Sequence, residues 1–271
     1  MLKDLTIGQY YPLPSLIHAL DPRLKLLSLI AFIVIIFLVN SLAAAIFVSL
    51  IVLLIIKLSK VPFKMYLKNL KTILPIIILT SFLNIFYMSE GESIIKFWVI
   101  NITVLGIRKA LLMSFRIIML IILSSVLTYT TTPTLLTDAI ESLLSPLRYI
   151  GLGGAVHTIA MMMTISLRFI PTLVDETEKL MNAQKARGAD FESGGIISRV
   201  KALIPILIPL LISSVRRAFE LSEAMESRCY TGNTLRTRLK QLQFSHRDFI
   251  AGAVIILSVG ATIILNNISI L

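Results

Sequence analysis

The chain has 271 residues, of which 56% are hydrophobic and 15% charged, and 26 Lys and Arg against 15 Asp and Glu give a net charge of +11. A soluble domain averages about 45–50% apolar and about 25% charged residues, so this composition excludes an ordinary soluble protein and indicates an integral membrane protein. In that class, excess cations point to cytoplasmic loops and anionic lipid rather than nucleic acid, and a single cysteine excludes an internal disulfide.

The first two predicted helices form a membrane hairpin. Asp21 and Pro22 make a favourable helix start, because Asp caps exposed N–H groups and Pro suits the first helical position. Two short apolar runs follow, at 26–39 and 42–56. Basic flanks lie on both sides, including five lysines and no acid in 57–71, and two cytoplasmic flanks require an even number of crossings. The basic run itself predicts an amphipathic cytoplasmic linker held by anionic lipid.

Three further apolar runs predict membrane crossings, the first of them bent at Pro75. The segment 88–108 is balanced in charge and holds Trp98, which suits an interface, so we expect an external loop there. Arg116 lies inside the next run, where an ionisable side chain either serves function or turns back toward the headgroups. With a cytoplasmic N-terminus, five crossings put the C-terminus outside. The three runs are 72–87, 110–129 and 249–265.

The segment 130–248 differs from the rest because it holds 14 Lys and Arg and 11 Asp and Glu. It also contains two apolar patches, 155–167 and 203–215, which fall short of the roughly 20 residues of a straight span. Pro205 and Pro209 are expected to bend the second patch. We therefore expect a helical cytoplasmic domain that lies against the membrane. Two additional crossings at these patches are the alternative, and they leave the C-terminus on the same side.

Two polar phrases end helices in this segment, AQKARG at 183–188 and AMESRC at 224–229. The first helix is expected to begin after Pro171 and to stop at Gly188, with acids early and bases late as the helix dipole favours. The second is expected over 213–230. One arginine at a helix end is an ordinary cap. Two arginines with small neighbours instead favour two exposed tips, each offering a planar charged fork to a carboxylate in a groove.

These paired phrases, together with LDPRLKL at 20–26, resemble the T component of energy-coupling-factor (ECF) ABC importers, the EcfT/CbiQ family, over essentially the whole chain. The resemblance implies that the two arginines end coupling helices and engage acidic grooves of two ATPase subunits. The second phrase departs from the family's Ala-Arg-Gly pattern but keeps small neighbours. The implied ATPase-coupling residues are Ala186, Arg187, Gly188, Ser227, Arg228 and Cys229, and Asp21, Pro22 and Arg23 form the implied structural motif.

The resemblance and the hydropathy pattern together imply an all-α polytopic membrane protein. About five transmembrane helices accompany a cytoplasmic, membrane-apposed coupling-helix domain. The expected location is a bacterial or archaeal cell membrane, with the N-terminus and the coupling domain in the cytoplasm. The implied domains are 1–129 with the lead and four membrane helices, 130–248 with the coupling helices, and 249–271 with the final membrane helix.

The implied function is non-catalytic. The protein is expected to transmit ATP-driven motion from two ATPases to a small membrane-embedded substrate-binding S component, for uptake of a vitamin or a metal micronutrient. No cofactor is expected to bind directly, and ATP is hydrolysed by the partners, since the sequence has no GxxxxGK[ST] phosphate loop. The alternative is a conventional permease that binds its own solute and carries a regulatory cytoplasmic domain. A membrane enzyme is disfavoured, because the five predicted spans contain no His, Glu or Asp.

Overall fold

The chain folds into two compact units. The bundle unit comprises residues 8–139 and 241–271, and the long-helix unit comprises residues 140–240. Between them they contain nearly all of the apolar runs that the sequence marks as helical. The computed structural model describes residues 10–87, 93–97, 100–191, 195–230 and 242–268.

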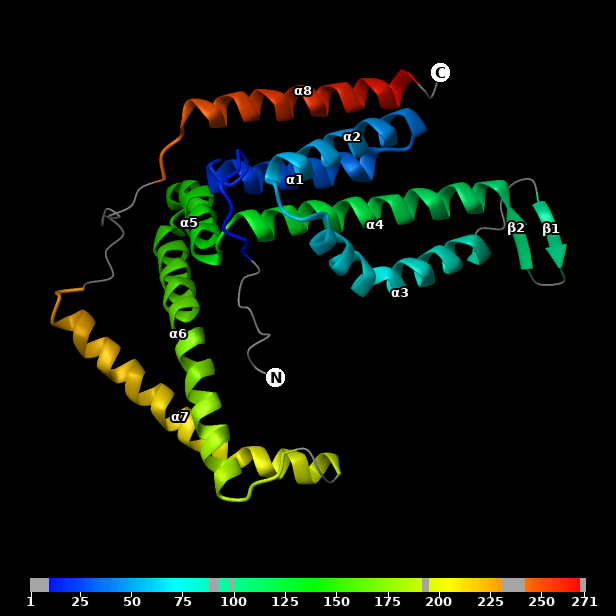
Figure 1. Ribbon diagram of the computed structural model, residues 1–271. Coiled ribbons are helices and arrows are strands. Elements are labelled where there is room, and N and C mark those ends of the chain that lie inside the picture. The colour runs from blue at the N-terminus through cyan, green and yellow to red at the C-terminus, as the bar shows by residue number, and fades with distance from the viewer. Residues whose placement is uncertain (1–9, 88–92, 98–99, 192–194, 231–241, 269–271) are drawn as a thin grey trace. The chain divides into compact units, whose positions relative to one another are not determined.

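Helices make up most of both units, with one antiparallel hairpin in the bundle unit (Figure 1). The bundle unit contains α1 (Pro22–Leu38), α2 (Leu42–Ser59), α3 (Phe63–Tyr87), β1 (Ser93–Phe97), β2 (Ile100–Thr103), α4 (Val104–Thr130) and α8 (His246–Ile268). Along the chain, α5 (Pro133–Leu144) leads from the first unit into the second. The long-helix unit continues with η2 (Ser145–Ile150), α6 (Gly153–Ala186) and α7 (Ile196–Glu226).

Six of the described helices are long and apolar enough to cross a membrane, judged by length and composition. The 17-residue α1 is not one of them. The predicted all-α polytopic membrane fold is confirmed, although the short β hairpin was not foreseen. The six helices are α2, α3, α4, α6, α7 and α8.

The antiparallel arrangement predicted for α1 and α2 is confirmed, although only α2 is long enough to count as a candidate membrane span, and polar side chains hold the turn between them. The two helices run in opposite directions (Figure 1). The guanidinium of Arg116 donates to the Val39 carbonyl at 2.9 Å and to Asn40 Oδ1 at 3.0 Å. Asn266 Oδ1 accepts from the backbone N–H groups of Asn40 at 2.9 Å and Ser41 at 3.2 Å. Arg116 therefore satisfies the Val39 carbonyl, which the end of α1 leaves open, a role that the sequence did not suggest.

The core of the bundle unit combines aromatic side chains, such as Tyr66 and Tyr129, with aliphatic ones, and the buried residues that α2 contributes are small or β-branched. In α2 they recur every fourth position, which places them on one helical face. Such side chains allow close helix approach in a membrane, while the leucines of the opposite face remain more than half exposed and suit contact with lipid. The buried residues are Ala44, Val48, Val52 and Ile56, and the exposed leucines are Leu50, Leu53 and Leu54.

The region before α4 differs from the sequence prediction in two ways. The basic run 57–71 is no separate linker, because α3 begins at Phe63 and includes most of it. Lysine is a good helix former, so the run continues directly into the apolar helix that contains Pro75. Part of the predicted external loop forms β1 and β2, and Trp98 lies outside the described residues.

The long-helix unit corrects both predicted helix starts. The helix of the first phrase does not begin after Pro171, because α6 runs for 34 residues with that proline inside it. The helix of the second phrase does not begin near Ser213, because α7 runs for 31 residues and includes Pro205 and Pro209. Each apolar patch is therefore continuous with the polar helix that follows it. Proline removes one backbone N–H and bends a helix, and the bend in α7 is visible in Figure 1.

Candidate functional site

The end of α6 is closed by a Schellman motif with an arginine at its cap position. Gly188 adopts the left-handed conformation, with φ +88°. Its N–H donates to the Lys185 carbonyl at 3.0 Å, and the next N–H, of Ala189, donates to the Gln184 carbonyl at 3.0 Å. These two bonds satisfy orphan carbonyls of the last turn. Arg187 is thereby fixed at the point where the helix stops.

The end of α7 repeats this motif in the second phrase. Cys229 has φ +54°, and its N–H donates to the Glu226 carbonyl at 2.8 Å. The following N–H, of Tyr230, donates to the Met225 carbonyl at 3.0 Å. The bonding pattern is the one seen at α6, with Arg228 in the place of the first arginine. The departure from Ala-Arg-Gly therefore leaves the backbone geometry unchanged.

Both helix ends present their arginines to solvent. Arg187 and Arg228 are exposed, and so are the small residues on either side of each. Within the described part of the chain, neither guanidinium forms an ion pair. An exposed, unpaired guanidinium with small neighbours is accessible to a carboxylate on another molecule. The small neighbours are Ala186, Gly188, Ser227 and Cys229.

The two helices cross at a polar contact that the sequence did not reveal. Arg217 of α7 pairs with Glu176 of α6 at 2.5 Å, and Ser213 donates to the other carboxylate oxygen at 2.5 Å. Both charged side chains are partly buried, with exposed fractions of 30% and 22%. The only signal in the sequence was the presence of acids and bases on two amphipathic helices, which does not specify a pair.

The crossing lies midway between the two arginine tips. Arg187 follows Glu176 by 11 residues, and Arg228 follows Arg217 by the same 11 residues. At 1.5 Å per residue, each tip lies roughly 16 Å along its helix from the crossing. Beyond the crossing, Tyr230 returns to Met161, near the start of α6, so the helices run antiparallel and the tips point in opposite directions.

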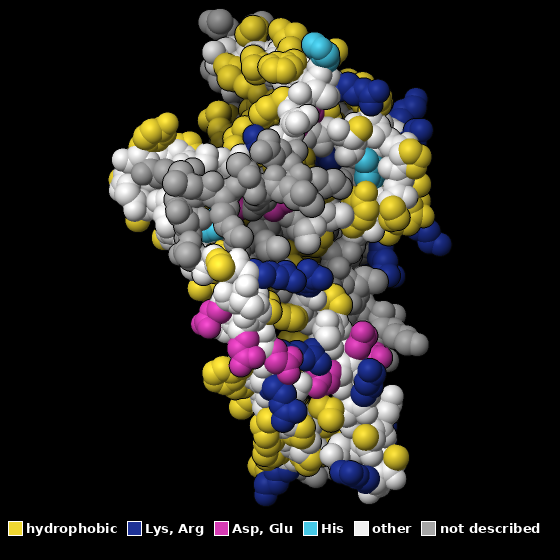
Figure 2. Space-filling model, turned by 90° about the vertical axis from the view of Figure 1, so that its left-hand side faces the viewer, with side chains coloured by type: hydrophobic (Ala, Val, Ile, Leu, Met, Phe, Trp, Pro, Cys, Tyr) yellow, Lys and Arg dark blue, Asp and Glu magenta, His cyan; other side chains and the backbone are white. Residues whose placement is uncertain are grey.

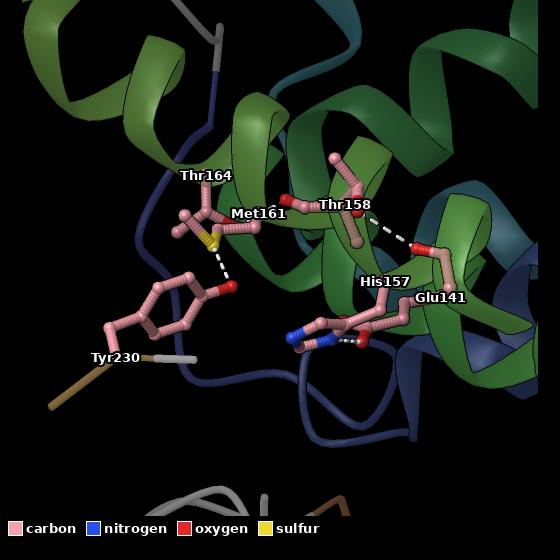
Figure 3. Close-up of polar contacts among 8 residues, drawn as sticks. Glu141, His157, Thr158, Met161, Thr164 and Tyr230 are labelled. Carbon is pink, nitrogen blue, oxygen red and sulfur yellow. Dashed lines mark hydrogen bonds and ion pairs between the residues drawn. The ribbon is translucent and has the colours of Figure 1, made fainter. Parts of the chain in front are cut away.

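One contact in the first half of α6 holds the end of α7, and a second joins α6 to α5 (Figure 3). The Tyr230 hydroxyl lies 2.8 Å from Met161 Sδ. One turn earlier on α6, His157 Nδ1 lies 3.1 Å from Glu141 Oε1 of α5. The second tip is thus held against one end of α6, while the first tip forms the other end.

Charged and apolar side chains occupy separate parts of the long-helix unit. Figure 2 shows acidic and basic side chains gathered in a band across the unit, with hydrophobic side chains beside it. On α7, exposed apolar residues recur every three or four positions and so share one face. We call this face the α7 stripe; it consists of Val200, Ile204, Leu207, Leu211 and Val215.

The Asp-Pro-Arg motif lies in the bundle unit and ties the start of α1 to the first turn of α8 and to the residues just before it. Asp21 caps α1 as predicted, accepting from the Arg23 N–H at 2.8 Å, and its own N–H donates to Asp248 Oδ1 at 2.8 Å. The Arg23 guanidinium donates to the Leu242 carbonyl at 3.3 Å and lies 5.5 Å from the centre of the Phe244 ring. The motif is therefore structural in its contacts.

Among the described residues, no three His, Cys, Asp or Glu side chains gather in a way that could hold a metal ion. The polar groups that the sequence singled out fall into two sets, the arginine tips in one unit and the Asp-Pro-Arg contacts in the other. The tips are the set that faces outward.

Comparison with known proteins gives a consistent result. Residues 14–239 match the model of the CbiQ family, described as cobalt transport protein. An energy-coupling factor transporter transmembrane protein EcfT of Ruminiclostridium cellulolyticum is 49% identical over 254 residues, covering 94% of each chain. Those of Clostridium kluyveri and Bacillus subtilis are 51% and 42% identical, covering 93% and 92% of this chain and 93% of each of theirs.

Proposed function

This chain belongs to the CbiQ/EcfT family of transporter membrane proteins, and on that premise we propose that it couples two cytoplasmic ATPases to a separate substrate-binding membrane subunit. It is a multi-pass cell-membrane protein and a component of an ECF-type transporter. Membership of the family makes it a non-catalytic subunit. In the proposal it binds no cofactor itself, its partners hydrolyse ATP, and the cargo is a vitamin or a metal micronutrient.

The observation that carries the proposal is that the two helix ends have the same backbone geometry. Arg187 and Arg228 occupy equivalent positions in two Schellman motifs, and both are exposed. Two equivalent tips that point in opposite directions fit two equivalent binding grooves, which we call sockets. A pair of homologous ATPases supplies one such socket on each subunit. A guanidinium suits a socket that contains a carboxylate, because its rigid fork can donate two parallel hydrogen bonds.

The crossing supports the coupling step of the proposal. When the ATPases close around ATP, each socket displaces the tip that it holds. Because Glu176 and Arg217 join α6 and α7 between the tips, these displacements turn the two helices about the crossing. The α7 stripe is apolar and exposed over several turns. In the proposal, the substrate-binding membrane subunit packs on this stripe and therefore moves together with α7.

A conventional permease requires a solute site within this chain, and the described residues offer little support for one. A cavity in the bundle unit is lined almost wholly by apolar side chains. Its hydroxyl groups at Ser28, Thr130 and Ser258 donate to backbone carbonyls of their own helices. A site that selects a polar nutrient needs several convergent polar groups.

The proposal predicts that removing the arginine tips releases the ATPases. Truncating one partner of a buried ion pair costs about 3–5 kcal/mol, so Arg187→Ala and Arg228→Ala should each weaken ATPase association more than a hundredfold. The double variant should lose both ATPases and substrate uptake. The measurements are co-purification of the ATPases and transport in proteoliposomes.

Lys179→Ala is the matched control, because this exposed cation lies on α6 between the crossing and the first tip. It should bind ATPases like the unmodified chain. Arg→Lys at either tip should restore association only in part, since the fork is lost. A double Ala variant that retains both ATPases and full uptake would show that the tips do not couple.

A further inference from the structure

An apolar cavity of about 490 Å³ lies inside the bundle unit. Its wall is made by side chains of α1, α2, α4 and α8, together with residues between 16 and 20, in the segment that precedes α1. This volume falls within the range of about 300–1,000 Å³ that is typical of ligand sites. Residues that represent the four helices are Phe32, Ile55, Leu123 and Ala251.

The polar groups of the cavity wall are already bonded, with one exception. The Lys25 ammonium donates to the carbonyls of Thr130 at 3.0 Å and His18 at 3.2 Å. The wall hydroxyls donate to carbonyls of their own helices, as described above. For the Arg247 guanidinium, no hydrogen bond or carboxylate partner is found among the residues that the structure describes. The cavity thus suits an apolar occupant, and its free charge is a cation.

Cations gather where the cavity opens. An adjoining hollow shares Leu16, Leu54, Leu58 and Arg247 with the cavity wall, and it adds Lys57 and Lys60. The hollow has no acidic residue in its wall. In the described parts of the chain, neither lysine forms an ion pair. Three cations that form no ion pair among the described residues therefore lie in the wall of the hollow that adjoins the apolar cavity, which we call its mouth.

We propose that this cavity is a binding site for an anionic phospholipid, with an acyl chain among the four helices and the phosphate at Lys57, Lys60 and Arg247. The occupant must combine a long apolar part with a negative head, since the cavity offers one kind of surface and its mouth the other. A basic pocket between membrane helices is the arrangement that recognises anionic headgroups. The site lies in the bundle unit and is distinct from the arginine tips.

The experiment compares lipid binding to the purified transporter by native mass spectrometry, using phosphatidylglycerol and phosphatidylcholine as probes. Each cation near an anionic headgroup strengthens binding roughly fivefold, so K57Q/K60Q/R247Q should weaken phosphatidylglycerol binding on the order of a hundredfold. The control K64Q/K68Q/K71Q removes the same charge from α3, outside both walls, and should keep binding. Unmodified protein should prefer phosphatidylglycerol to phosphatidylcholine.

A second pair of variants tests the acyl-chain cavity. Ala251→Phe fills space at the wall and should expel the lipid, whereas Ala253→Phe, on the exposed side of α8, should not. Equal losses in the two charge variants would overturn the proposal in favour of diffuse attraction. Full competition by inorganic phosphate would indicate an anion site without a tail. Release of a membrane subunit by Ala251→Phe, with lipid binding unchanged, would identify a protein occupant and overturn the proposal as well.

Discussion

Gly188 and Cys229 occupy the same left-handed position at the two helix ends, with different side chains. The left-handed conformation costs a residue with a Cβ roughly 1–2 kcal/mol of conformational free energy, whereas glycine adopts it at almost no cost. No atom lies within 4 Å of a Cβ added at Gly188, so the effect of a substitution there is conformational. The cap of α7 therefore carries a conformational free-energy cost at Cys229 that the cap of α6, with Gly188, does not carry.

We predict opposite effects for exchanging the two residue types. Gly188→Ala should destabilise the end of α6 by about 1 kcal/mol, and Cys229→Gly should stabilise the end of α7 by a similar amount. Hydrogen–deuterium exchange of the capping amides, those of Gly188 and Ala189 and of Cys229 and Tyr230, measures both. Gly195→Ala, at a position with negative φ, is the control. Exchange rates that do not respond would contradict the left-handed caps.

At the scale of helices, the sequence predicted which helices exist more accurately than where each helix begins. Charge and hydropathy correctly separated α1 from α2, because Asn40 and Ser41 interrupt an apolar run between two basic flanks. The predicted starts of α6 and α7 were wrong: the first was set after Pro171, and the second was set near Ser213, where the charged residues begin. Pro171, Pro205 and Pro209 instead lie inside helices whose other residues maintain the hydrogen-bond ladder on both sides.

The crossing of α6 and α7 gives a prediction at this same scale. Glu176→Ala and Arg217→Ala should each destabilise the helix pair, and a double-mutant cycle should give a coupling energy of about 1–2 kcal/mol, reduced from a fully buried pair by the partial exposure of both groups. Thermal unfolding of the purified protein measures the coupling.

The functional readout separates the crossing from the tips. The Glu176→Ala/Arg217→Ala variant should still bind both ATPases, because Arg187 and Arg228 are intact. It should lose uptake, because displacement of one tip no longer turns the other helix. Glu178→Ala, which removes an acid close by on α6, is the control and should transport normally. Normal uptake by the double variant would show that the crossing is not a pivot.

For the whole molecule, the sequence predicted the class of fold and the two tips, and it missed how the tips are placed. Composition alone indicates a membrane protein, and repetition of a short phrase indicates paired helix ends. Their separation depends on which turns of α6 and α7 meet. That is set by Glu176 with Arg217 and by Met161 with Tyr230, pairs 41 and 69 residues apart in the chain. No local pattern identifies such partners.

This separation gives a prediction for the assembled transporter. Each tip lies roughly 16 Å from the crossing, and Met161, beside which Tyr230 holds the second tip, is 26 residues from Arg187 on α6, so the two tips should lie on the order of 30–40 Å apart. Cys229 is the only cysteine of the chain, so Cys229→Ser, which keeps a small side chain beside Arg228, gives a cysteine-free background. One spin label can then be placed at Asn182→Cys on α6 and a second at Ser222→Cys on α7, which are exposed positions shortly before the two tips. With cysteine-free ATPases, the distance between the two spin labels can be measured by pulsed electron paramagnetic resonance spectroscopy. It should shift by several ångströms when a non-hydrolysable ATP analogue closes the ATPases. A distance that remains the same with and without nucleotide would show that the tips are static anchors, and coupling would then have to pass through another surface.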